Sequence, residues 1–186
     1  MDKTTKKNVK TPLVKKRANL LLPPLQAQMK NGRHVVNTKN LSGKKNGFTY
    51  WLGIPLAVAK TIHSDFDFVR LSTAGITKSS INSLASHIGI SRKNMAEDIF
   101  DVSVKTLERK DSKTKLDKKT SSHAFEIAKV VQHAYEVFRD EEKMKLWINR
   151  ENRALNNMKP IQLFDSLSGL NMVNDILGRI EEGVYS

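Results

Sequence analysis

The hydrophobic positions of this chain recur every three to four residues, and the alternation that marks β-strands is nearly absent. The longest helical pattern begins at Asp117 or Thr120 and places these apolar residues on one face: Ala124, Ile127, Ala128, Val131, Ala134, Tyr135 and Phe138. Four shorter helices are predicted before it, with Ser64, Thr77, Ser91 and Ser103 as N-caps and Gly75 and Gly89 as stops. The pattern therefore predicts an all-α fold.

A second apolar seam lies near the end of the sequence. Pro160 is expected to start a short helix that contains Ile161, Leu163 and Phe164. A last helix is predicted after Ser168-Gly169, with Leu170, Val173, Leu177, Ile180 and Val184 on one face and Met172 and Ile176 beside them. Such a seam is more often core than interface. The helix runs almost to the last residue, however, and a segment held at one end can enter a partner's cleft at little cost to its own fold.

Composition and length limit the possible classes of protein. A chain of 186 residues with 39% hydrophobic content fits one compact domain with extensions, and it has no apolar run long enough for a membrane span or a signal peptide. We therefore expect a cytoplasmic protein with no membrane partner. The absence of cysteine excludes disulfides and cysteine metal sites. Trp147 is expected to pack the last segment against the preceding helix.

The net charge of +13 is concentrated at the front of the chain. Residues 1–70 carry a net charge of +11, residues 71–138 carry +3, and residues 139–186 carry −1. A basic front half favours an anionic partner, most often nucleic acid. Residues 1–46 are rich in Lys, Asn, Thr and Gly and are predicted to form a mostly disordered basic arm. The arm is equally compatible with a phosphate-binding extension and with a solubilising leader.

The segment Ser91 to Lys110 has the dimensions of a helix-turn-helix, with the turn at Asp101-Val102. In the second helix, Val104 and Leu107 are expected to pack inward. Short polar groups and cations suit base edges and phosphates in the major groove. The side chains expected to contact DNA are Arg92, Lys93, Ser103, Lys105, Thr106, Arg109 and Lys110. Two short helices joined by a turn also occur in many α-proteins that bind no nucleic acid.

A catalytic function finds no support in the sequence. The five histidines are scattered, and no phosphate-binding glycine loop, serine elbow or paired carboxylate motif is present. The clusters Asp140-Glu141-Glu142 and Glu181-Glu182 lie where acidic residues more often cap helices or complement a basic partner. We therefore expect a non-enzyme with no catalytic residues, no metal and no cofactor.

The tail resembles a known domain. Trp147, Asn152, Ala154-Leu155, Pro160, Leu163, Gly169, Val173, Leu177, Arg179-Ile180-Glu181 and Gly183-Val184-Tyr185 look like the C-terminal toxin-binding domain of the Xre/MbcA/ParS antitoxin family. Ser103, Thr106-Leu107 and Arg109 are similar to the recognition helix of the family's Xre-type N-terminal domain. The resemblance covers residues 64–186. It divides the chain into the arm 1–46, an Xre-like helical domain 47–138 with its helix-turn-helix at about 91–110, and a toxin-binding domain 139–186.

The resemblance implies a function and a set of partners. Antitoxins of this family dimerise, repress their own operon and neutralise a RES-domain toxin that consumes NAD, and their C-terminal end reaches the active-site region of the toxin. The resemblance thus implies a homodimer or higher assembly, operator DNA and a RES-domain toxin as partners. The expected toxin-binding residues are Pro160, Leu163, Gly169, Val173, Leu177, Arg179, Ile180, Glu182, Gly183, Val184, Tyr185 and Ser186.

Three positions depart from the family's pattern. Asp101 occupies the turn, where Gly or Asn is more usual, although Asp tolerates the left-handed conformation. Glu97 falls where a small residue normally allows close helix crossing, which leaves the register of this helix open by one residue. Ser121-Ser122-His123 matches the start of the family's long helix only in being polar. The alternative function is a stand-alone helix-turn-helix transcriptional regulator whose C-terminal domain only dimerises.

Overall fold

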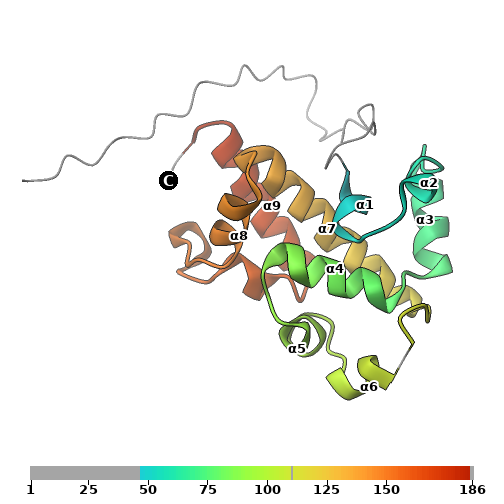
Figure 1. Ribbon diagram of the computed structural model, residues 1–186. Helices are drawn as coiled ribbons and strands as arrows, with labels where there is room; N and C mark the ends of the chain where they lie inside the picture. The colour runs from blue at the N-terminus through green and yellow to red at the C-terminus, as the bar shows by residue number, and fades with distance from the viewer. Residues whose placement is uncertain (1–46, 110, 185–186) are drawn as a thin grey trace, which may run out of the picture.

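The computed structural model describes residues 47–109 and 111–184, and within these residues the protein is all-α (Figure 1). The α-helices are α1 (Phe48–Trp51), α2 (Leu56–Ala59), α3 (Asp65–Ala74), α4 (Lys78–Ile88), α5 (Arg92–Asn94), α6 (Val104–Arg109), α7 (Lys118–Phe138), α8 (Glu141–Ile148) and α9 (Leu167–Glu181). Shorter pieces are a π-helical turn η2 (Met95–Ile99) and the 3₁₀ helices η3 (Arg153–Leu155) and η4 (Pro160–Leu163). The fold-class prediction is confirmed. The predicted arm, residues 1–46, lies outside the described residues.

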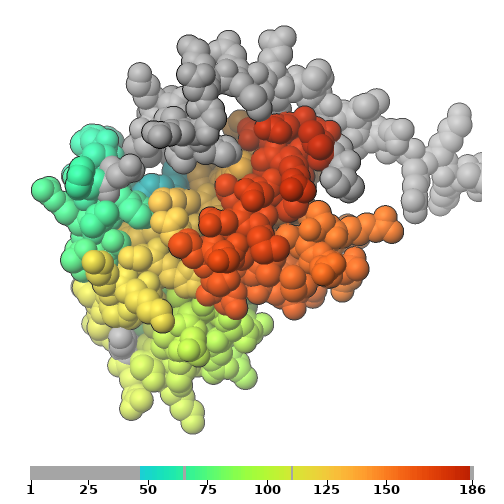
Figure 2. All heavy atoms as spheres, turned by 180° about the vertical axis from the view of Figure 1, so that it is seen from behind, coloured from blue at the N-terminus to red at the C-terminus, as the bar shows by residue number. Residues whose placement is uncertain are grey.

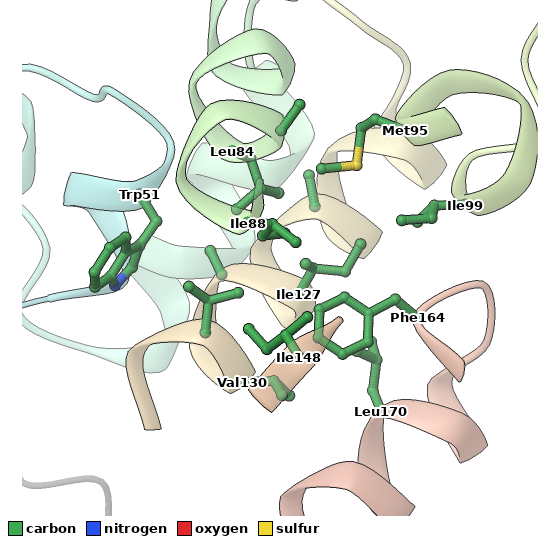
Figure 3. Close-up of a cluster of buried hydrophobic side chains, with 14 of the residues drawn as sticks. Trp51, Leu84, Ile88, Met95, Ile99, Ile127, Val130, Ile148, Phe164 and Leu170 are labelled. Atoms are coloured by element: carbon green, nitrogen blue, oxygen red, sulfur yellow. The ribbon is translucent and has the colours of Figure 1, made fainter. Parts of the chain in front are cut away.

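The long helix α7 is the centre of the fold. Asp117 caps its start by accepting a hydrogen bond from the backbone of Thr120 at 2.9 Å, and Arg139 ends it with a φ of 54°. Helices α1, α3, α4, α8 and α9 all pack against it. Figure 3 shows the resulting core, in which Ile127 and Val130 of α7 meet these residues of other elements: Leu84, Ile88, Met95, Ile99, Ile148, Phe164 and Leu170.

Helix α1 is fixed to α7 by one buried tryptophan, a contact that the sequence pattern did not predict. The indole of Trp51 is fully buried, and its Nε1 donates a hydrogen bond to Oε1 of Gln132 at 2.7 Å. Burying an indole stabilises the fold only if its N–H finds an acceptor, which Gln132 supplies here. The described chain therefore begins with a segment that belongs to the core.

Helix α3 begins as predicted, with Ser64 and Asp67 forming a reciprocal capping box. The carboxylate of Asp67 accepts hydrogen bonds from the backbone of His63, from the backbone of Ser64 and from the hydroxyl of Ser64. These bonds lower the pKa of Asp67, with the bond from His63 as the largest cause. Gly75, with a φ of 78°, ends the helix as predicted.

The capping box of α3 should make stability depend on pH in acid. Because the pKa of Asp67 is lower in the folded state, its contribution is present above the ordinary aspartate pKa and is lost as pH falls through the lowered value. We expect Asp67→Ala to lower the thermal midpoint near pH 6, and the difference from wild type to shrink on going to about pH 3. Thermal melts of both proteins across this range test it; a constant difference would contradict it.

Helix α4 has the predicted bounds, and Thr77 is its N-cap residue as predicted, although its side chain makes no capping hydrogen bond. Thr77 precedes the helix, yet its hydroxyl is 2.6 Å from that of Ser79 and makes no bond to a backbone N–H. The predicted stop at Gly89 is confirmed, with a φ of 80°. The helix packs between α1, α7 and α8.

The last helix starts earlier than predicted. Helix α9 begins at Leu167 because Ser166, rather than the Ser168-Gly169 pair, is its N-cap and accepts a hydrogen bond from the backbone of Gly169 at 3.1 Å. Gly169 therefore lies in the first turn of α9 and not before it. The short helix predicted at Pro160 exists as the 3₁₀ helix η4, and Phe164 directly after it is fully buried.

One core joins the two predicted helical domains. Helix α9 lies along α7, and the buried cluster contains residues of α4, α7, α8 and α9 together. The predicted boundary between residues 138 and 139 coincides with the end of α7 at Phe138. Whether the two parts fold separately stays a prediction.

Candidate functional site

The predicted helix-turn-helix is formed by α5, η2 and α6. Ser91 caps α5 as predicted, because its hydroxyl accepts a hydrogen bond from the backbone of Asn94 at 3.1 Å. In η2, Ala96 is buried and Glu97 is exposed. The small buried residue of this segment is therefore Ala96, which resolves the register left open at Glu97 in favour of the preceding residue. The carbonyl of Ala96 also accepts a hydrogen bond from the backbone of Val102 at 2.8 Å.

The turn has the backbone conformation expected for its position. Asp101 adopts a φ of 51°, in the left-handed region where Gly or Asn is more usual. In α6, Leu107 is buried and Val104 is half-buried, as predicted. Lys78 of α4 donates from Nζ to the carbonyl of Glu108 at 2.9 Å, which joins α4 to α6. The two short helices are therefore held in a fixed arrangement on the core.

The side chains predicted to contact DNA lie on one exposed segment. The exposed residues of this set are Arg92, Lys93, Ser103, Lys105, Thr106 and Arg109. Nε of Arg109 donates to the carbonyl of Lys105 at 3.4 Å, and Lys93 lies 3.9 Å from Glu97. Lys110 is outside the described residues. Their exposure leaves these side chains accessible to DNA, and their role in binding it stays a prediction.

The charge of this segment is balanced, in contrast to the whole chain. Residues 91–111 contain five Lys or Arg and five Asp or Glu. Residues 1–46 contain twelve Lys or Arg and one Asp, so they carry +11 of the net charge of +13. Because attraction to the phosphate backbone scales with the number of cations that reach it, the arm is the stronger source of such attraction. The helix-turn-helix offers shape and hydrogen-bonding groups rather than an excess of positive charge.

The predicted toxin-binding residues divide into a buried and an exposed group. Pro160, Gly169, Val173 and Leu177 are buried, and Leu163 and Ile180 are half-buried. Arg179, Glu182, Gly183 and Val184 are exposed, and Tyr185 and Ser186 lie outside the described residues. Met172, expected beside the apolar seam, is also exposed, whereas Ile176 is buried. Most of the seam is therefore core, and the exposed group at the end of α9 is the part that a partner could reach.

The end of α9 has a defined geometry. Gly183 has a φ of 74°, and its backbone N–H donates to the carbonyl of Ile180 at 3.1 Å. The next N–H, of Val184, donates to the carbonyl of Arg179 at 2.9 Å. This pair of bonds is a Schellman motif, which requires a residue that tolerates positive φ. It presents Val184, which is 55% exposed, in a fixed position after the helix.

Histidines attach the C-terminal elements to the rest of the molecule. Nδ1 of His133 on α7 is hydrogen-bonded to Oδ1 of Asn174 at 2.6 Å, and its Nε2 lies 3.5 Å from Glu181. Nε2 of His123 is hydrogen-bonded to the carbonyl of Phe164 at 2.8 Å. These contacts give the two α7 histidines structural positions. Among the described residues, no group of three or more His, Cys, Asp or Glu is arranged to hold a metal ion.

A groove between the end of α7 and α8 was missed by the sequence reasoning. It has a volume of about 300 Å³ and is lined by Phe138, Lys143, Leu146, Trp147, Arg150, Glu151 and Asn152. The predicted role of Trp147 is confirmed, because its ring packs on that of Phe138 with centroids 5.5 Å apart. The sequence did contain one signal: Met144 and Ile148 form the buried face of α8, which leaves Leu146 on the outer side.

The helix-turn-helix and the end of α9 lie far apart on the molecule. Figure 2 shows α9 in red across one face, with the yellow-green elements α5, η2 and α6 at the bottom. In Figure 1 the end of α9 is again at the opposite side of the molecule from α6. A partner at one of these surfaces would leave the other accessible.

The structure thus defines an all-helical protein in which two short helical segments joined by a turn, α5 with η2 and then α6, are connected through one core to a small C-terminal helical unit. Residues 133–183 match the family model of the antitoxin Xre/MbcA/ParS C-terminal toxin-binding domain. A curated relative, antitoxin Xre of Photorhabdus laumondii subsp. laumondii, is 30% identical over 90 residues, which are 47% of this chain and 61% of the relative. The resemblance to the Xre/MbcA/ParS antitoxins is therefore confirmed, and the family match places it in the C-terminal part of the chain.

These comparisons also set how far the likeness extends. The chain spans 61% of the length of the curated relative that it matches. The family match begins at His133, inside α7, and ends at Gly183, one residue before Val184, whose N–H makes the outer bond of the Schellman motif. It therefore contains both the groove and the end of α9. Among the described residues, no helix is both long and apolar enough to cross a membrane.

Proposed function

We propose that this chain is the antitoxin of a type II toxin-antitoxin system and that it neutralises the toxin through its C-terminal domain. The observation that carries the proposal is the end of α9: a fixed, exposed turn on a helix anchored in the core, where the matched toxin-binding domain ends at residue 183 and Val184 follows directly. The resemblance implies that the toxin is a RES-domain protein that consumes NAD. Both proteins would then meet in the cytoplasm.

Neutralisation is steric in this proposal. The exposed turn, with Val184 at its tip, enters the mouth of the toxin's cleft and denies NAD access to it. Arg179 is exposed one turn earlier and adds a charged contact at the mouth. The buried residues Val173 and Leu177 hold α9 on α7, so the turn is presented without ordering a long segment on binding.

Co-expression with the product of the neighbouring gene tests this proposal. If that product is the toxin, it should arrest growth alone and be harmless together with this chain, and the two should elute as one complex in size exclusion. Absence of both rescue and complex would reject the antitoxin function. The protein would then fit the alternative, a stand-alone regulator whose C-terminal domain serves assembly.

The proposal includes binding to operator DNA. A helix of six residues such as α6 reads only a few base pairs, so specific binding requires two copies related by a two-fold axis. The chain would therefore bind a palindromic operator as a homodimer or higher antitoxin assembly. The helix-turn-helix would supply base contacts, and the basic arm would supply much of the attraction to phosphates.

Removing two cations of α6 should weaken operator binding. We expect Lys105→Ala combined with Arg109→Ala to reduce affinity more than tenfold and to lower the slope of log affinity against log salt by about two. Fluorescence anisotropy with the operator, measured at several salt concentrations, checks both numbers. Arg153→Ala with Lys159→Ala, which removes two exposed cations of the C-terminal unit, is the control. Unchanged affinity in the α6 variant would move the DNA interface elsewhere, to the arm first.

A further inference from the structure

The groove between α7 and α8 exposes apolar surface that the core of the protein does not bury. Its floor is apolar, formed by the packed rings of Phe138 and Trp147. Leu146 at its side is 65% exposed. The neighbours Met144 and Ile148 are fully buried and already attach α8 to the core. Leu146 is therefore not needed for packing, and an exposed leucine next to two aromatic rings is typical of an interaction surface.

Two cations stand at the rim of this groove. Lys143 and Arg150 are both exposed, and neither has an ion-pair partner among the described residues. On the same helix, by contrast, Lys145 lies 3.4 Å from Glu141 and 2.9 Å from Glu142. The groove thus combines an apolar floor with a lining of two cations and one carboxylate, Glu151, which leaves a net positive charge of one. A complementary surface would present an apolar side chain next to acidic groups.

The groove and the end of α9 belong to the same matched domain. All seven lining residues lie between residues 133 and 183, and none of them is part of the exposed turn at the end of α9. A toxin-binding domain that presents two separate exposed features most simply uses both for one partner. The apolar floor and centre of such a contact contribute affinity, whereas the turn in the cleft blocks the substrate.

We propose that this groove is a second contact with the toxin and receives an apolar side chain of the toxin flanked by carboxylates that face Lys143 and Arg150. The inference rests on the proposed antitoxin function. The groove provides the affinity of the complex, and the end of α9 provides the block. Variants of the two contacts should therefore behave differently. A groove variant should fail to neutralise the toxin at a low excess of antitoxin and should neutralise it again at a high excess.

Affinity measurements with the purified product of the neighbouring gene test the groove. We expect Leu146→Asp to weaken the complex roughly 30-fold or more, because an aspartate cannot be buried against the partner's apolar side chain. The matched control is Leu167→Asp, which changes a leucine that is 60% exposed in the same domain but outside the groove. The control should bind within about threefold of wild type.

A second variant tests the cations and does not depend on Leu146. Lys143→Glu with Arg150→Glu should weaken binding more than about tenfold and reduce its salt dependence, since two attractive charges become repulsive. Lys118→Glu with Lys119→Glu is its control. Circular dichroism and thermal melts establish that each variant is folded. Wild-type affinity in both groove variants would overturn the inference and leave the antitoxin function standing, whereas failure of the wild-type protein to bind would reject the proposed function itself.

Discussion

Removal of residues 182–186 is expected to abolish neutralisation of the toxin while the rest of the protein stays folded. The deletion takes away the exposed turn and its Schellman bonds but leaves Leu177 fully buried and Glu181 near His133. The anchoring of α9 is therefore kept. We expect growth rescue to be lost and the thermal midpoint to move by no more than a few degrees, about 4 °C at most. Operator binding should be unchanged, because α6 lies at the other end of the molecule (Figure 1).

A point variant separates loss of the turn from fraying of the helix end. Val184→Asp keeps the backbone bonds of the turn and changes a side chain that is 55% exposed. If the turn enters an apolar part of the toxin's cleft, this variant should lose rescue as the deletion does, with no change in stability. A truncated protein that still protects cells at the wild-type dose would show that the end of α9 does not block the toxin.

Local helix signals in the sequence predicted most of the element boundaries correctly. Ser64, Gly75, Gly89 and Asp117 all cap or end helices where the pattern placed them. These signals succeed because a cap depends on residues within one turn of the chain. The start of α9 was predicted wrongly because the signal is so local. Two serines, Ser166 and Ser168, precede Gly169, and the pattern cannot decide which of them is the N-cap.

The candidate site was predicted less completely than the fold. Helical periodicity identifies an apolar face but does not say whether that face meets the protein's own core or a partner. The resemblance placed Val173 and Leu177 in the expected toxin-binding set, and their periodicity could not show that the structure buries them against α7. The groove depends on the packing of Phe138 against Trp147 across a helix junction, a contact between two elements that no single periodicity encodes.

The segment before the turn at Asp101 could not be predicted correctly from the sequence for a third reason. The segment Met95–Ile99 forms a π-helical turn, which widens the helix and shifts its register by a fraction of a turn. The register that the comparison with the family's pattern left open at Glu97 is resolved by the structure, in which Ala96 is buried and Glu97 is exposed. Irregular turns of this kind follow from tertiary packing and have no reliable sequence signal.

Gly169 is expected to be the most sensitive glycine of the C-terminal domain. A Cβ at this position would overlap the carbonyl oxygen of Leu163 and lie 3.0 Å from the Cβ of Leu163. The obstacle is backbone, so η4 and α9 would have to separate. We expect Gly169→Ala to destabilise the protein by about 2 kcal/mol, because overpacking costs more than the gain of about 1 kcal/mol in helix propensity.

The matched control for this substitution is Gly178→Ala in the same helix, where a Cβ would have no atom within 4 Å. Here the gain in helix propensity acts alone, so this variant should be up to about 1 kcal/mol more stable than wild type. Chemical denaturation of the two variants beside wild type measures the sign of the change in unfolding free energy for each substitution. If Gly169→Ala were as stable as Gly178→Ala, the close approach of α9 to η4 would be wrong. A destabilising Gly169→Ala beside a stabilising Gly178→Ala would instead show that Gly169 serves the packing of α9 on η4.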